Sequence, residues 1–202
     1  MRIKVYVEGG GDYPAGRTLI RDAFRSLLCQ FVYNKQGLEV VARGGKSETI
    51  KAFWDGCDSE PNYFSILLLD SDGLATDAPI DNLRGQGETA RLSEIDPSRL
   101  QRMVRAMEAW IVADPDGLRR VYRGAFHSGK LPSKSAEIEV IDSRELKTML
   151  LAATEHSEKG TYDNVYDIEE IFETVDVHII RKRCRHFDAL CSLLEGLAKG
   201  ET

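Results

Sequence analysis

The segment YFSILLLD, residues 63–70, decides the fold class of this 202-residue chain. Its nearly continuous apolar run is typical of a strand that is covered on both faces within a parallel sheet. Two strand patterns precede it, RIKVYV at residues 2–7 and LEVVAR at 38–43. Parallel neighbours need crossover connections, which are usually helical. The order of strand, helix, strand, helix and strand predicts an α/β core with right-handed crossovers.

The intervals between the three strand patterns have the spacing of helices. Apolar residues recur at helical spacing from Arg17 to Tyr33, and residues Ser47 to Trp54 carry a shorter apolar face. Farther along, Asp114-Pro115 predicts a helix start, because Asp can accept hydrogen bonds from free backbone N–H groups and Pro suits the first turn.

The second half of the chain is predicted to be mainly helical. A helix is expected from about residue 143 to 154, and residues 155–199 carry further helical patterns that end in the amphipathic segment FDALCSLLEGLA. We therefore expect an α/β core over residues 1–122 and a helical C-terminal extension over 123–202, packed on the core as one compact unit.

The composition is that of an ordinary globular protein, with 42% hydrophobic and 30% charged residues. No stretch approaches the roughly 18 consecutive apolar residues of a membrane span, and Met1 leads directly into a strand pattern, so we expect a cytoplasmic protein. The net charge of −6 argues against broad nonspecific nucleic-acid binding but permits a local basic patch. The four cysteines lack paired CxxC spacing and are expected to be free thiols.

Acidic residues come after two of the predicted strands, at the point where each strand ends. Glu8 ends the first strand, and Asp70 and Asp72 leave the third. In an open α/β sheet, ligands bind outside the carboxyl ends of the strands. An Asp-x-Asp pair there can direct both side chains toward one cation, and oxygen ligands favour Mg²⁺ or Mn²⁺ over zinc. We expect a site for such an ion, completed by Glu8.

Three glycines, Gly9, Gly10 and Gly11, come directly after Glu8. Bare backbone of this kind lets N–H groups approach a phosphate, as helix-start loops do in other proteins. Each motif alone also has a structural interpretation: EGGG as a tight turn with a solvated acid, and DSDG as a turn with a helix cap. Two acidic strand ends in one sheet favour a site that holds a phosphate next to a metal.

Two other phosphate-site motifs fit the sequence less well. Gly45-Lys46-Ser47 looks like the end of a P-loop, but that motif requires glycine at position 40, where this chain has Val40. The DSD stretch also resembles the nucleophile motif of haloacid dehalogenase-type phosphatases. That pattern usually has Thr or Val where this chain has Leu74, and it normally opens the fold, whereas here two strands precede it.

Two further segments are candidates for function. Residues 73–98 carry Gly, Pro, Asp and Asn at close intervals without a period, which predicts a long loop and a candidate lid. The only dense basic run, Arg181-Lys182-Arg183 with Arg185 and His186, is either a contact to a nucleic-acid backbone or the solvated face of a helix.

The motifs VYVEGGGD at residues 5–12 and LLLDSDG at 67–73 together resemble the Toprim domain of topoisomerases, bacterial primases, small RNA-maturation nucleases and OLD (overcoming lysogenization defect) nucleases. With GGKSE, MEAWIVADP and EKGTYDN added, residues 3–195 resemble the DUF4276 proteins, a family of small stand-alone Toprim-like proteins. The resemblance implies a Toprim-like, Rossmann-like core in which helices flank a mostly parallel sheet.

The resemblance also implies roles for individual acids. Glu8 matches the Toprim glutamate, a general acid/base or metal ligand in phosphodiester transfer. Asp70 and Asp72 match the metal-binding pair, and Asp12 stands where OLD-like members have a further acid. Glu108 matches the acid of the MEAW stretch, so we expect it to face the same site as a catalytic residue.

The activity that the resemblance implies is metal-assisted hydrolysis of DNA or RNA, with one or two Mg²⁺ or Mn²⁺ ions stabilising charge on the phosphate oxygens. Lys46 and Lys159 are candidate phosphate contacts. OLD-like Toprim domains work with an ATPase, so a partner ATPase is expected. No tyrosine can be assigned as a topoisomerase nucleophile, and no primase module is present. The alternative is a non-catalytic Toprim-derived module that binds nucleic acid, nucleotide or a protein partner.

Overall fold

A computed structural model describes residues 2–11, 13–32, 35–71 and 95–200 of the chain. The candidate ligands Asp12 and Asp72, and residues 73–94 of the predicted lid, lie outside the described residues. The strands are β1 (Arg2–Glu8), β2 (Leu38–Arg43), β3 (Tyr63–Ser71) and β4 (Leu100–Val104). The helices are α1 (Pro14–Leu28), α2 (Lys46–Ser59), α3 (Glu108–Val112), α4 (Pro115–Tyr122), α5 (Ser143–Thr154), α6 (Ile168–Thr174), α7 (Val177–Arg183) and α8 (Arg185–Lys199).

The four strands form a parallel sheet in the order β2-β1-β3-β4, which confirms the predicted α/β class. The three apolar runs form β1, β2 and β3 as expected. The fourth strand, β4, was not predicted, because LQRMV is short and places half-exposed Gln101 and Arg102 in its middle. Among the described strands, it lies at the edge of the sheet and pairs only with β3.

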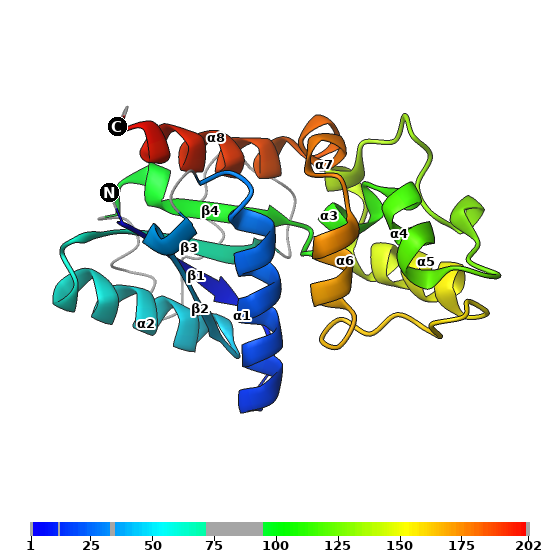
Figure 1. Cartoon of the computed structure of the whole chain (residues 1–202), viewed down its shortest axis with the longest axis horizontal. Coiled ribbons are helices and arrows are strands. Elements are labelled where there is room, and N and C mark those ends of the chain that lie inside the picture. Colours follow the sequence, from blue (N-terminus) through cyan, green and yellow to red (C-terminus); the bar gives the residue numbers. More distant parts are fainter. Residues whose placement is uncertain (1, 12, 33–34, 72–94, 201–202) are drawn as a thin grey trace.

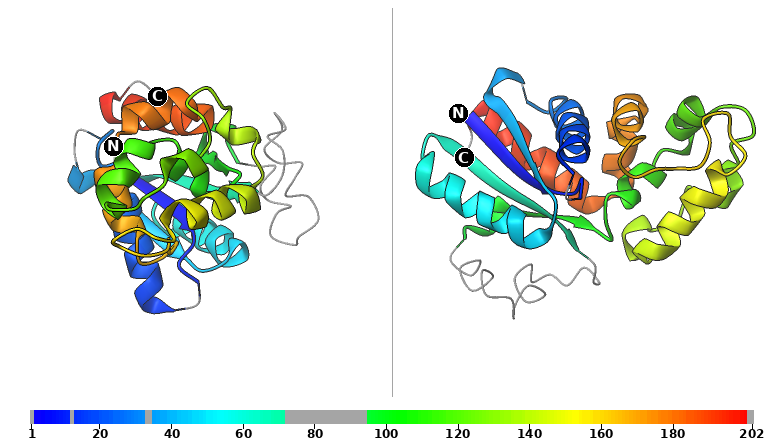
Figure 2. Two further views of the ribbon diagram at one scale, coloured as in Figure 1. Left: turned by 90° about the vertical axis from the view of Figure 1, so that its right-hand side faces the viewer. Right: turned by 90° about the horizontal axis from the view of Figure 1, so that it is seen from below.

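Helices cover both faces of the sheet (Figures 1 and 2). Val5 and Val7 of β1 belong to the larger core cluster, together with apolar residues of α1 and α8. Tyr6, between them, packs instead with Phe53 of α2, with ring centroids 5.7 Å apart. The alternation of side chains along β1 therefore supplies two cores, one on each face.

The helices α3 to α6 lie beyond the carboxyl ends of the strands (Figure 2). Trp110 of α3 joins this region to two helices that cover the sheet, because its ring lies 6.2 Å from that of Phe24 in α1 and 4.7 Å from that of Phe187 in α8. The final helix, α8, then returns to cover the sheet near β4. The C-terminal helical region predicted from the sequence is thus confirmed, whereas its boundary at residue 122 stays a prediction.

Several local predictions can be compared directly with the structure. α4 begins at Pro115 as expected, with Asp114 Oδ1 accepting a hydrogen bond from the Gly117 N–H at 3.0 Å. α5 has the predicted bounds, but α1 runs from Pro14 to Leu28, earlier than the apolar spacing suggested. All four cysteines are free. None of the described helices is long and apolar enough to cross a membrane.

Candidate functional site

The two acidic strand ends lie on neighbouring strands. β1 and β3 pair in parallel with Val7 opposite Leu68, and continuing this register places Glu8 opposite Leu69, one residue before Asp70. Both acids are half-buried. Glu8 Oε2 and Asp70 Oδ1 are each almost fully shielded from solvent. The structure therefore brings these two predicted residues to one edge of the sheet.

The directions of the two side chains limit where a shared cation would lie. Tyr6 points toward α2, while Leu68 belongs to the core under α1 and α8. Because side chains alternate along a strand, Glu8 leaves on the α2 face and Asp70 on the opposite face. An ion contacted by both would lie beyond the ends of the strands. Within the described ranges, no group of three or more His, Cys, Asp or Glu side chains could hold a metal, so the metal site stays a prediction.

The glycine turn after Glu8 packs directly on the start of α1. All three glycines have positive φ, namely 138° at Gly9, 86° at Gly10 and 58° at Gly11. A Cβ at Gly10 would lie 2.7 Å from the Arg17 backbone, and one at Gly16 would lie 2.5 Å from the Gly10 carbonyl oxygen. Only glycines allow this approach, so the predicted stretch of bare backbone next to a helix start is present.

Lys46 lies at the same edge of the sheet as Glu8. β2 pairs with β1 so that Arg43 is opposite Glu8, and Lys46 comes three residues later as the first residue of α2. Its side chain is half-buried. This position is compatible with the predicted phosphate contact.

Glu108, the first residue of α3, is reached through an unusual turn. Arg105 and Ala106 have positive φ values of 69° and 112° without being glycine, a strained conformation that recurs at functional sites. The Arg105 N–H donates to the carbonyl oxygen of Ser71 at 3.2 Å. Because Ser71 directly follows Asp70, the turn starts close to that acid.

The Glu108 side chain is buried and has a partner that was not predicted. Its Oε1 accepts a hydrogen bond of 3.4 Å from the hydroxyl of Tyr162, whose own N–H donates to Thr154 Oγ1 at 2.9 Å. Burial, and then the nearby Glu108 charge, raise the pKa of Tyr162 well above its usual value. Tyr162 belongs to the EKGTYDN stretch, but no spacing rule relates it to an acid 54 positions away.

Lys159 forms a different cluster from the strand-end acids. Its Nζ lies 2.6 Å from Glu170 Oε2 and 3.4 Å from Asp167 Oδ1, and the hydrogen bond to Glu170 is the main cause of its raised pKa. Asp167 also accepts a hydrogen bond from the Tyr122 hydroxyl at 2.7 Å. These contacts hold the segment before α6 in place, and the phosphate contact of Lys159 stays a prediction.

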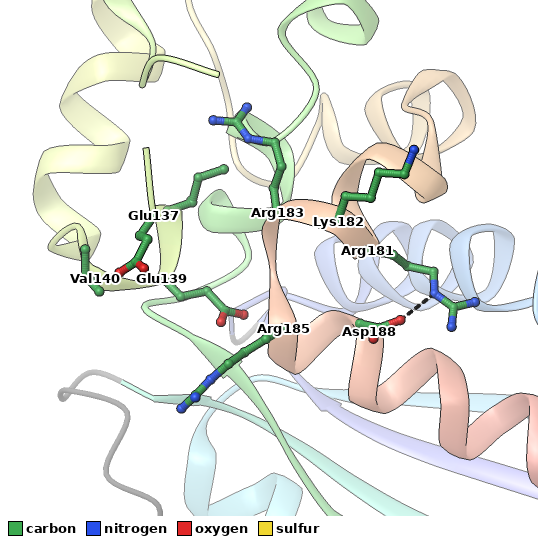
Figure 3. A pocket seen from close by; sticks show the side chains of 9 residues that line it. Glu137, Glu139, Val140, Arg181, Lys182, Arg183, Arg185 and Asp188 are labelled. Atoms are coloured by element: carbon green, nitrogen blue, oxygen red, sulfur yellow. Dashed lines mark hydrogen bonds and ion pairs between the residues drawn. The ribbon is translucent and has the colours of Figure 1, made fainter. Parts of the chain in front are cut away.

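The basic run at the α7–α8 junction lines a pocket of about 470 Å³ (Figure 3). Arg181 donates to Asp188 at 2.7 Å and to Glu195 at 2.6 Å, and the guanidinium of Arg183 donates to two backbone carbonyl oxygens. Figure 3 shows the four basic side chains pointing in different directions rather than toward one another. These contacts favour the structural interpretation of the run over a nucleic-acid contact.

The comparisons with known proteins identify a family. The DUF4276 family, described as a domain of unknown function, matches residues 7–195, which is nearly the whole chain. No curated protein and no solved structure gives a significant match. Because the match includes both the strand-end acids and the helical region with Glu108 and Lys159, the chain belongs to the DUF4276 family.

Proposed function

We propose that this protein is a Toprim-like nuclease that hydrolyses phosphodiester bonds of DNA or RNA with Mg²⁺ or Mn²⁺. The observation that carries the proposal is the placement of Glu8 and Asp70 at the carboxyl ends of adjacent parallel strands. Two negatively charged carboxylates at such neighbouring positions favour binding of a divalent cation that prefers oxygen ligands. Asp72 and Asp12 are proposed as further ligands.

The surroundings of the two acids suit a phosphate. α1 begins beside the glycine turn without a side-chain cap and without an acid in its first turn, so its N-terminal dipole is not already neutralised by an acid of the helix. A bound Mg²⁺ or Mn²⁺ would stabilise negative charge on the phosphate oxygens and lower the pKa of a bound water. Lys46 would add positive charge on the β2 side, and Glu8 or Glu108 would hold or transfer a proton.

A non-catalytic role is the alternative, and two observations favour it. Among the residues that the structure describes, no three ligating side chains come together as a metal site, and Glu108 is engaged by Tyr162. In that case the glycine turn and the strand ends would bind a nucleic acid, a nucleotide or a partner ATPase without cleaving a bond. Such a module would not need Glu8 for affinity.

The deciding experiment measures cleavage of single-stranded and double-stranded DNA and RNA with Mg²⁺ or Mn²⁺. We expect Glu8→Gln and Asp70→Asn to lower the rate by about 100-fold or more, with unchanged circular dichroism. Glu173→Gln, an exposed acid on α6, is the control and should cut at the normal rate. Cutting that persists in both site variants would refute the proposal. Absence of cutting, together with binding that Glu8→Gln leaves intact, would establish the binding module.

A further inference from the structure

The outward side of α1 carries a stripe of arginines. Arg17, Arg21 and Arg25 are spaced four residues apart, so they lie on one side of the helix, about 6 Å apart along its axis. Arg21 and Arg25 are exposed, and Arg17 is half-buried. The only acid on α1 is Asp22, which pairs with Arg21 at 2.8 Å. This helix is therefore basic in a chain whose net charge is −6.

Two exposed tyrosines lie where this arginine stripe begins. The side chains of Tyr13 and Tyr166 are 79% and 75% exposed, and no other Phe, Trp or Tyr side chain in the described parts of the chain is largely exposed. Tyr13 immediately precedes α1, and Tyr166 precedes α6 by two residues. Val165 contacts α1 at Gly16, where an added Cβ would lie 3.5 Å from Val165 Cγ1. The two tyrosines thus lie close in sequence to the contact between Val165 and Gly16, which joins the segment before α6 to the start of α1.

The backbone that carries Tyr166 is held firmly although its ring is exposed. Asp163 Oδ1 accepts hydrogen bonds from the N–H groups of Val165 and Tyr166 at 2.8 and 2.9 Å. Asp167 Oδ2 accepts one from the Asp163 N–H at 2.9 Å, and Tyr122 fixes Asp167 in turn. A tyrosine ring presented from a fixed backbone loses little conformational entropy when it contacts a ligand.

We propose that Tyr13, Tyr166 and the arginine stripe form a track for single-stranded nucleic acid that leads into the glycine turn. The inference rests on the proposed function in taking nucleic acid as the substrate. Arginines bind phosphates, while exposed aromatic rings stack on bases, which requires bases that are not paired in a duplex. The track ends at the candidate site, because Gly10 packs against the backbone of Arg17.

The test measures the affinity for fluorescently labelled single-stranded DNA and RNA oligonucleotides in EDTA, so that no metal-dependent cutting occurs. Tyr13→Ala with Tyr166→Ala should weaken binding by about tenfold or more, since one stacked base contributes on that order. The matching Tyr→Trp pair keeps the aromatic rings and should retain the affinity. A duplex of the same sequence should bind without dependence on the two tyrosines.

A second pair of variants tests the arginines. Arg21→Gln with Arg25→Gln should flatten the slope of log affinity against log salt by about 1.4, or about 0.7 for each phosphate that the protein no longer neutralises. Arg144→Gln with Lys147→Gln removes two exposed cations from α5 and is the matched control, which should leave the slope unchanged.

The outcomes separate this inference from the proposed nuclease activity. If single strands do not bind in EDTA, or if both track pairs bind like the wild type, the track is refuted even when the protein cuts nucleic acid. If binding depends on the tyrosines and arginines but no cutting occurs, the track stands and the nuclease proposal fails. Circular dichroism and melting curves of each variant establish that the loss of affinity is not a loss of folding.

Discussion

The charged residues are arranged differently at the two ends of the sheet. At the amino end, Lys4 is almost fully buried and its Nζ lies 3.0 Å from Glu39 Oε2 and in contact with Glu60. At the carboxyl end, the acids Glu8 and Asp70 lie on neighbouring strands, and Glu8 is followed directly by the glycine turn. At the amino end the acids pair with Lys4. At the carboxyl end two acids of neighbouring strands come to one edge of the sheet, an arrangement that suits a divalent cation. The first arrangement serves stability, and the second suits a ligand.

The pKa shifts at the amino end agree with this description. Burial lowers the pKa of Lys4, but hydrogen bonds to Glu60 and Glu39 outweigh it, so the pKa is raised. The hydrogen bond from the Tyr63 hydroxyl is the main cause of the lowered pKa of Glu39. Each shift favours the charged form, as expected for ion pairs that stabilise the folded chain.

The largest effect is expected from adding a methyl group at the carboxyl end. In Gly10→Ala the new Cβ would meet the Arg17 backbone at 2.7 Å in a residue with φ of 86°. We expect the free energy of unfolding to fall by about 2–4 kcal/mol, measured by urea denaturation. Gly11→Ala is the matched control, because its φ is also positive but nothing lies within 4 Å of the new Cβ. Equal losses in the two variants would show that close packing on α1 does not matter.

The next-largest effects are expected from removing the charge of one acid at each end of the sheet. Glu8→Gln should remove metal-dependent cutting while leaving the melting temperature nearly unchanged. Glu39→Gln should do the opposite, because it weakens contacts to Lys4 and Tyr63 at the amino end. As Glu39 is partly exposed, we expect it to lose only about 1 kcal/mol of stability. A loss of activity in Glu39→Gln without a loss of stability would contradict the assignment of stability to the amino end and of activity to the carboxyl end.

The contacts of Glu39 at the amino end also make stability depend on pH. Because the pKa of Glu39 is lowered in the folded state, its contribution is present above the unfolded value of 4.5 and is lost as pH falls through the folded value. The difference in melting temperature between the wild type and Glu39→Gln should therefore be constant near neutral pH and shrink below about pH 4.5. A difference that grows in acid would mean that Glu39 is not paired in the folded protein.

Much of this comparison could be predicted from the sequence, because it depends on apolar runs and on the residues at their ends. β1, β2 and β3 are apolar runs, and Glu8 and Asp70 mark the ends of two of them. The start of α4 was predictable for a similar reason, since the Asp114 cap acts within four residues. Local patterns of this kind do not require knowledge of the tertiary structure.

The features that were not predicted depend on contacts between distant segments. β4 is held by pairing with β3 rather than by an apolar period of its own. Arg105 and Ala106 have positive φ, but neither is a glycine or asparagine, the residue types that would have indicated it in the sequence. The ion pairs of Lys159 with Glu170 and Asp167 were not predicted either, because the sequence around a lysine does not reveal which acids lie near it in the fold.

The smallest effect, and the sharpest test of how far the carboxyl-end site extends, is expected from Tyr162→Phe. The variant removes one long hydrogen bond to Glu108 without changing the shape of the core, so stability should fall by only about 0.5–1 kcal/mol. If Glu108 works with Glu8, losing the hydroxyl that positions it should lower kcat several-fold and leave KM unchanged, because the substrate does not contact Tyr162 directly. Tyr122→Phe is the matched control, since it removes the hydroxyl that binds Asp167 instead. Equal kcat values in Tyr162→Phe and the wild type would restrict the site to the strand ends and leave Glu108 a structural residue of α3.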